Sequence, residues 1–149
     1  MTISQKCQYA IRALLELSKH HGAVPLKSGD IAARQAIPAR FLEVILNELK
    51  TSGLVEARRG VQGGFLMVCR PEELTVGRVI RLVDGPLDPV RCTADPDKSS
   101  CPLRDKCSLI ELWAEAKVAL EAVYDGTTFR DLVDRDQALD RSVAANYCI

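Results

Sequence analysis

The chain has 149 residues, 47% of them hydrophobic and 27% charged, a balance that excludes a disordered or collagen-like protein. No run of about 18 apolar residues predicts a membrane span, and the N-terminus lacks the basic start and apolar core of a signal peptide, so we expect a cytoplasmic protein with no membrane partner. The formal net charge of zero hides a basic first half, since residues 1–70 carry a net +5 and residues 71–149 a net −5, and a basic half suits the phosphates of a nucleic acid.

Three helices are predicted in this basic half, because apolar residues recur there at helical spacing. The first spans residues 4–21, and a short second helix spans residues 28–35. After a tight turn at residues 36–37, the third helix begins at Pro38, where a missing N–H costs nothing, and it ends before Gly53. The last two helices and their turn form a predicted helix-turn-helix.

A two-stranded hairpin is predicted next. Residues 54–58 alternate like a half-buried strand, and residues 65–68 form its partner. The six residues between them contain three glycines, which permit tight turns, a positive φ and close approach to a partner. With a short helix over residues 74–83, capped by Thr75, this order predicts a winged helix-turn-helix domain over residues 1–84, in a mainly α fold with a small β-hairpin wing.

The second half of the chain is predicted to hold a loop, a long helix and a tail. Residues 85–107 are rich in proline, aspartate and serine and form a long irregular loop. Ser108 and Glu111 are interpreted as a capping box that opens a long helix. Apart from the first helix, no long helix of the chain covers its apolar stripe, so we interpret residues 108–133 as a dimerisation region. The charged residues 134–149 are expected to form a poorly ordered tail.

The third helix holds the first candidates for reading DNA, because the N-terminal end of the second helix of this motif lies in the major groove. Arg40 can donate two hydrogen bonds to guanine, and Glu43 can accept one from cytosine. Polar and basic residues of the wing reach the DNA backbone or an adjacent minor groove. The residues predicted in this way are Arg40, Glu43, Asn47, Lys50, Arg58, Arg59 and Gln62.

Three of the six cysteines lie in the predicted loop, with eight residues between Cys92 and Cys101 and five between Cys101 and Cys107. In a reducing compartment, clustered cysteines indicate metal or redox chemistry rather than disulfides. Zinc sites more often show a C-x-x-C pair with a fourth cysteine or histidine, and this loop has neither. The spacing therefore favours an iron–sulfur cluster with a borrowed fourth ligand. Buried cysteines and a thiol switch are the alternatives.

Short motifs along nearly the whole chain carry a resemblance to a known family. They are Lys6-Cys7-Gln8-Tyr9-Ala10, Leu42-Glu43, Gly53-Leu54-Val55, Arg59-Gly60, Gly63-Gly64-Phe65, Thr75-Val76-Gly77, Val83-Asp84, Arg91-Cys92, Cys101, Cys107 and Leu112-Trp113. In combination they resemble the Rrf-two family of winged-helix transcriptional regulators, which includes repressors.

The resemblance implies a homodimeric regulator that binds double-stranded operator DNA. It also implies that Arg40, Phe41 and Glu43 lie on the recognition helix and that Arg59 lies on the wing. By the same resemblance, three loop cysteines ligate a [2Fe–2S] or [4Fe–4S] cluster, namely Cys92, Cys101 and Cys107.

The sequence departs from the family pattern at the fourth cluster ligand. A histidine that some members carry three residues after the last cysteine is Ile110 here, which cannot ligate a metal. An acidic residue that other members contribute from the first helix of the partner subunit is Gln8 here. Cys7 is adjacent and can substitute if that helix turns slightly, although its place on the apolar stripe also fits a small core residue. The first two loop cysteines are also further apart than in well-known members.

Two other functions compete with a cluster-controlled regulator. A DNA-binding regulator can use the same cysteines as a clusterless thiol switch, and an iron–sulfur carrier can contain an incidental winged helix. An enzyme is not expected, because the chain shows no Ser/His/Asp set, no phosphate-binding loop and no paired catalytic carboxylates in a suitable context.

Overall fold

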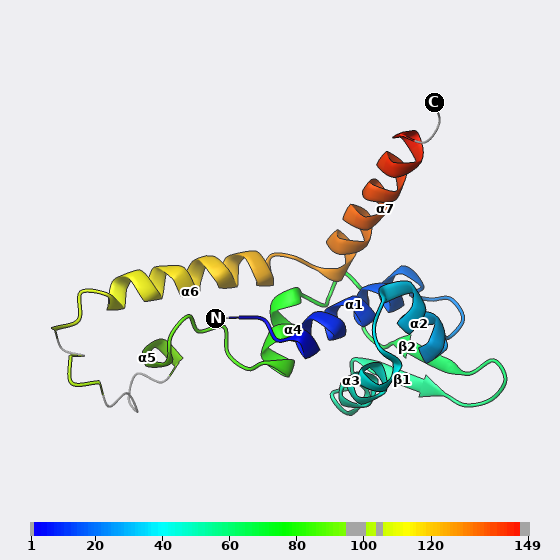
Figure 1. Cartoon of the computed structure of the whole chain (residues 1–149), viewed down its shortest axis with the longest axis horizontal. Coiled ribbons are helices and arrows are strands. Elements are labelled where there is room, and N and C mark those ends of the chain that lie inside the picture. Colours follow the sequence, from blue (N-terminus) through cyan, green and yellow to red (C-terminus); the bar gives the residue numbers. More distant parts are fainter. Residues whose placement is uncertain (1, 95–100, 104–105, 147–149) are drawn as a thin grey trace.

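The computed structural model describes residues 2–94, 101–103 and 106–146. Residues 95–100 and 104–105 of the predicted cysteine loop, and residues 147–149 of the predicted tail with Cys148, lie outside this described part. The elements in chain order are α1 (Gln5–Lys19), α2 (Ser28–Gln35), α3 (Ala39–Thr51), β1 (Val55–Arg58), β2 (Gly64–Met67), α4 (Val76–Val83), α5 (Arg91–Ala94), α6 (Ile110–Asp125) and α7 (Phe129–Asn146). Figure 1 shows a body made of α1 to α4 and the hairpin, from which α6 and α7 extend in different directions.

The predicted mainly α fold with a small hairpin wing is confirmed. Within the described ranges, no helix has the length and apolar character needed to cross a membrane.

Helix α1 lies at the centre of the body. It begins after Ser4, whose side chain accepts a hydrogen bond from the backbone N–H of Cys7, and it ends two residues earlier than predicted. The apolar stripe of α1 packs on α2, α3, α4 and α7. The core that these helices share is aliphatic and includes Leu14, Leu17, Ile31, Leu46, Leu49 and Val79. Helix α3, which carries four of the predicted DNA-reading residues, is therefore held by this central element.

The predicted tight turn between the second and third helices is confirmed. Helix α2 ends at Gln35, and its C-cap Ala36 adopts a left-handed conformation (φ 50°) and donates its N–H to the carbonyl of Ala32. Helix α3 begins at Ala39, one residue later than predicted, with Pro38 as its N-cap. The inner face of α3 is buried through Leu42, Ile45, Leu46 and Leu49. The core thus fixes which face of α3 remains exposed.

Strand β2 ties the hairpin to the segment that leads into α2. Strands β1 and β2 are antiparallel, and Val55 pairs with Met67. The second residue of β2, Phe65, exchanges two backbone hydrogen bonds with Leu26, which lies between α1 and α2 (3.0 and 2.7 Å). The base of the wing therefore moves with the segment that leads into α2.

The prediction of a poorly ordered tail after residue 133 is wrong for the described residues. Helix α7 runs to Asn146, and its start is capped by Asp131, whose carboxylate accepts hydrogen bonds from the N–H and hydroxyl of Thr128 (2.8 and 2.7 Å). Phe129 and Val133 are buried and anchor the helix on the body. The charged sequence after Val133 is the exposed continuation of this anchored helix.

The predicted N-cap of α4 at Thr75 is confirmed.

The predicted capping box at the start of the long helix is also wrong. Helix α6 begins at Ile110 with Leu109 as its N-cap, and no side chain caps it there, so Ser108 lies outside the helix. Gly126 follows its last residue as the C-cap. No residue of α6 is buried, and apolar side chains along it are exposed, including Leu112, Val118 and Val123.

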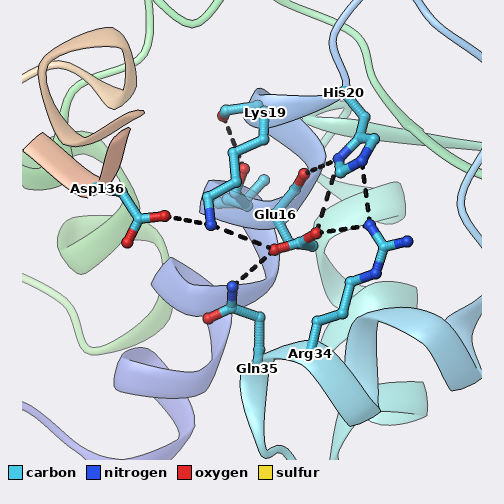
Figure 2. Close-up of polar contacts among 8 residues, drawn as sticks. Glu16, Lys19, His20, Arg34, Gln35 and Asp136 are labelled. Atoms are coloured by element: carbon cyan, nitrogen blue, oxygen red, sulfur yellow. Dashed lines mark hydrogen bonds and ion pairs between the residues drawn. The ribbon is translucent and has the colours of Figure 1, made fainter. Parts of the chain in front are cut away.

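A buried carboxylate joins α1 to α2. Glu16 is only 3% exposed and accepts hydrogen bonds from Arg34 (3.1 Å) and Gln35 (2.8 Å) of α2. Lys19 Nζ lies 3.6 Å from Glu16 Oε2 and also pairs with Asp136 of α7. Figure 2 shows this set of contacts as one network between three helices. The network fixes the helix that precedes the recognition helix.

This network predicts a stability that depends on acidic pH. Burial alone raises the pKa of Glu16, but hydrogen bonds from Gln35 and Arg34 and the charge of Lys19 outweigh it and lower the pKa from its ordinary value near 4.5. Such a carboxylate stabilises the folded state above that ordinary value, and its contribution is lost as the pH falls through it and below. We expect Glu16→Gln to lower the free energy of unfolding by about 1–3 kcal/mol at neutral pH.

The difference in the free energy of unfolding between wild type and Glu16→Gln is expected to disappear as the pH approaches about 3. Urea unfolding across this pH range measures it, and Glu43→Gln, a change at an exposed glutamate of α3, serves as the control. A difference that stays constant with pH would contradict the stabilising role of the ionised carboxylate.

Candidate nucleic-acid interface and cysteine loop

Four predicted DNA-reading residues lie on one face of α3. Arg40, Glu43, Asn47 and Lys50 follow one another at intervals of three or four residues, so they share a face of the helix, and all four are exposed. The buried leucines and isoleucine lie on the opposite face. The major groove of DNA admits an α-helix, and this face offers it two cations, one carboxylate and one amide.

Phe41 lies at the flank of this face and contacts α1. Its ring centroid is 6.3 Å from that of Tyr9, with the two planes at 52°. This tilted geometry is typical of a favourable aromatic pair. Because Phe41 is still largely exposed, the structure places it where it supports the recognition helix and also borders the candidate interface.

The wing presents the other predicted contacts. Arg58, Arg59 and Gln62 are exposed, and Arg58 Nη2 lies 3.0 Å from Glu56 Oε1 on the same strand, so its charge is shared with that carboxylate. Sequence reasoning missed Val61, which is 89% exposed between these residues. Its signal was an apolar residue inside a polar, glycine-rich loop. Some minor-groove-binding proteins insert exposed apolar side chains between base steps.

The three loop cysteines lie far from the wing. Cys92 is on the short helix α5 and is half-buried, Cys101 is exposed, and Cys107 is half-buried shortly before α6. Figure 1 shows this region near the end of α6 that points away from α3 and the wing. Their thiols have the donor chemistry of an iron–sulfur site. In the part of the chain that the structure describes, however, no three His, Cys, Asp or Glu residues are grouped so as to hold a metal ion. Ligation by these cysteines therefore stays a prediction.

The two candidate fourth ligands lie in different surroundings. Cys7 is fully buried in a small apolar cluster with Val76, Ile80 and Leu87. Burial, with a smaller effect of Asp84, raises the pKa of Cys7 to about 12, so it is a thiol at neutral pH. This environment supports its alternative role as a core residue. Gln8 is exposed, and its side-chain amide donates to the carbonyl of Ile3 (3.1 Å). Whether either residue is a ligand stays a prediction.

A helix-turn-helix, an exposed polar face on its second helix and an adjacent hairpin define the class of winged helix-turn-helix DNA-binding proteins. The chain belongs to the Rrf2 family. The family model that matches it is described as "Rrf2: Iron-dependent Transcriptional regulator", and the match covers residues 3–135.

Individual relatives support the same assignment. The chain is 33% identical over 132 residues to the HTH-type transcriptional regulator CymR of Bacillus subtilis, with 89% of each chain covered. It is also 33% identical over 142 residues to the HTH-type transcriptional regulator IscR of Escherichia coli, covering 95% of this chain and 86% of that protein.

Solved structures of such regulators share the fold. The structure described as CymR (YrzC), the global cysteine regulator of B. subtilis, superposes with a TM-score of 0.74 at 30% identity, over 91% of this chain and 98% of that chain. The structure of T. potens IscR superposes with a TM-score of 0.71 at 26% identity, over 91% and 88%. CymR and IscR are both described as transcriptional regulators.

Proposed function

We propose that the protein is a homodimeric transcriptional regulator of the cytoplasm that binds an operator through α3 and the wing, with an affinity set by its loop cysteines. The observation that carries this proposal is the exposed face of α3 beside the wing. The cations of this face, Arg40 and Lys50, and Arg59 of the wing suit phosphates and guanines, and the other polar groups of the face suit base edges. Residues 1–70, which contain this surface, have a net charge of +5.

The exposed apolar side chains of α6 support the dimer. A long helix with no buried residue and with Leu112, Val118 and Val123 exposed offers a surface for a second copy of itself. Dimers of this class place their recognition helices in half-sites about 34–36 Å apart. Dimerisation through α6 therefore lets one protein engage two successive turns of the same face of DNA.

The cysteine loop is the proposed sensory site. Cys92, Cys101 and Cys107 would hold an iron–sulfur cluster, which supplies a group that responds to redox change, iron or nitric oxide when it is bound. The description of the matching family as iron-dependent supports this proposal. Cys107 lies three residues before α6, so the shape of the loop acts directly on the helix proposed to join the dimer.

A clusterless thiol switch is the second candidate. Cys101 is exposed and free, which makes it accessible to oxidants. A similar solved structure is described as the oxidized form of Staphylococcus aureus CymR (TM-score 0.69, 26% identity, covering 89% of this chain and 96% of that chain). An iron–sulfur carrier has less support than either, because it leaves the exposed face of α3 without a role.

Selection of binding sites from random DNA duplexes tests the proposed function. We expect a preferred sequence with two related half-sites. Arg40→Ala is expected to lose about 1–3 kcal/mol of binding free energy, which is about 5- to 150-fold in Kd, and to relax the preference at one base of each half-site. Fluorescence anisotropy at fixed salt measures these affinities.

Two further variants make the result specific to the interface. Arg59→Ala, on the wing, is expected to weaken binding to all sequences to a similar extent and to reduce the salt dependence. Arg141→Ala, an exposed arginine of α7, is the matched control and is expected to bind like wild type. Selection that recovers no preferred sequence would contradict the regulator, and an unchanged Kd in Arg40→Ala would exclude that residue from the interface.

A further inference from the structure

Helix α6 is fixed to the body at its C-terminal end. The N–H of Val76 donates to the carbonyl of Thr127, and the N–H of Phe129 donates to the carbonyl of Leu74, both at 2.9 Å. Phe129 is buried in the main core, and Tyr124 packs against the smaller cluster around Cys7. The rest of α6 extends from this anchor toward the cysteine loop, as Figure 1 shows.

Charged residues line the face of α6 that meets the body. Lys117, Glu121 and Asp125 are spaced by four residues and therefore lie on one face; we call them the α6 charge stripe. Arg81 of α4 donates two hydrogen bonds to the carboxylate of Asp125 (2.6 and 2.8 Å) and one to Glu121 (3.3 Å). Two turns of α6 are thus held against α4 by one guanidinium.

The remaining charge of the stripe contacts the base of the cysteine loop. Lys117 Nζ lies 2.9 Å from Oδ1 of Asp88, a residue four positions before Cys92. The Asp88 side chain is only 7% exposed, and within the described residues neither of its carboxylate oxygens accepts a hydrogen bond of good geometry. An uncompensated buried carboxylate is costly. The charge of Lys117 therefore couples the position of the loop base to that of α6.

A glycine of α4, Gly77, makes room for the contact between Arg81 and Asp125. A side chain at Gly77 would place its Cβ against Oδ1 of Asp125 and 3.0 Å from Nη1 of Arg81. Glycine leaves the space that the ion pair fills. No residue of α6 is fully buried, and the charge pairs of Lys117, Glu121 and Asp125 hold its C-terminal half against the body together with the packing of Tyr124.

We propose that the α6 charge stripe, through Arg81 and Asp88, fixes the angle between α6 and the DNA-binding body. Its members and partners are positioning residues for operator recognition. The inference rests on the proposed function, because in a dimer joined through α6 this angle sets the separation of the two recognition helices. Half-sites for this motif are read at a separation of about one helical turn, so a small rotation changes which spacing fits.

Charge reversal at Arg81, and its compensation at Asp125, test the proposed role of the α6 charge stripe. Arg81→Glu places like charges opposite Asp125 and Glu121, and the double variant Arg81→Glu/Asp125→Arg restores one opposite pair. Arg78→Glu, an exposed position one turn earlier on α4, makes the same change in net charge and is the matched control. Full-length variants are titrated with the selected operator, with a single half-site, and with operators whose half-site spacing is changed one base pair at a time.

Wild type is expected to prefer one spacing. Arg81→Glu is expected to keep its half-site affinity within about twofold, to lose about tenfold or more of its preference for the operator over the half-site, and to bind the altered spacings almost equally. The double variant and Arg78→Glu are expected to keep the spacing preference. This pattern would not arise from a general loss of stability, which lowers half-site and operator binding together.

An unchanged spacing preference in Arg81→Glu, or an equal loss in Arg78→Glu, would overturn the inference. Should Arg81→Glu fail to unfold cooperatively, Asp125→Asn removes the pair without placing like charges together, and an unchanged preference in that variant overturns it as well. If wild type itself binds no pair of half-sites more tightly than a single half-site, the proposed dimeric regulator is contradicted, and the proposed role of the α6 charge stripe is contradicted with it. If wild type prefers one half-site spacing and every variant keeps that preference, only the proposed role of the α6 charge stripe is contradicted.

Discussion

Protein prepared without oxygen is expected to contain iron and acid-labile sulfide, and Cys107→Ala is expected to lose both. Thiolates are the protein ligands that hold iron–sulfur clusters, and removing one of three leaves too few to retain the group. The loss is therefore expected to be nearly complete rather than partial, and Cys92→Ala and Cys101→Ala are expected to show it too. Metal and sulfide analysis of each dimer, together with a visible spectrum, measures the result.

Cys69→Ala is the matched control for the loop variants. Cys69 is a half-buried free cysteine outside the loop, and burial raises its pKa, so it is expected to be dispensable for iron. Absence of iron and sulfide from wild type, even after reconstitution, would reject the cluster. Operator binding that then changes with an oxidant and returns with a reductant would establish the thiol switch instead.

Cys7→Ala separates the two roles of that residue in the same assay. Its burial among Val76, Ile80 and Leu87 leads us to expect that iron is retained and that the free energy of unfolding falls. Loss of iron with a preserved fold would make Cys7 the fourth ligand, as the sequence comparison with the family allows.

The DNA-binding body was predictable from sequence because its determinants are local. The periodicity of α1 and α3, the turn at Ala36 and the cap at Thr75 each depend on residues within one or two helical turns. The exposed face of α3 followed from the same periodicity, since burial of one face leaves the other exposed. Family resemblance added Phe41, whose contact with Tyr9 connects residues far apart in the chain.

The features that sequence reasoning missed depend on long-range contacts. The charged sequence after Val133 looked like a tail because Phe129, which anchors α7, packs in a core formed by residues far away in the chain, and because α7 contacts α1. Glu16 lies among apolar residues of α1, and its partners Arg34 and Gln35 come from another helix. The capping box failed because a favourable local pattern, at Ser108, does not require the helix to begin there. Grouping of the loop cysteines is not shown by either sequence or structure.

The glycines of the wing were predicted to permit close approach to a partner, and the structure shows a close approach within the chain itself. A Cβ added at Gly64 would lie against the carbonyl oxygen of Leu26 and 2.6 Å from its carbonyl carbon. The obstacle is backbone, which cannot rotate aside as a side chain can. Leu26 is also held by its two hydrogen bonds to Phe65, so β2 and the segment around Leu26 must separate to admit the extra atom.

Gly64→Ala is therefore expected to lower the free energy of unfolding by about 2–4 kcal/mol. Chemical unfolding followed by circular dichroism measures the change. Gly29→Ala is the matched control, because Gly29 is an exposed residue of α2 with no atom near the added Cβ. This control is expected to be neutral or to stabilise the protein by up to about 1 kcal/mol.

Gly64→Ala is also expected to weaken DNA binding, through the position of the wing. Separation of Phe65 from Leu26 moves the strand that carries the wing away from the segment leading into α2, so Arg59 and α3 no longer meet one surface. At a temperature where the variant is still folded, its operator affinity is expected to fall by more than that of Arg59→Ala. Equal affinities of the two variants would show that the wing contributes through Arg59 alone and that its position relative to α3 is unimportant.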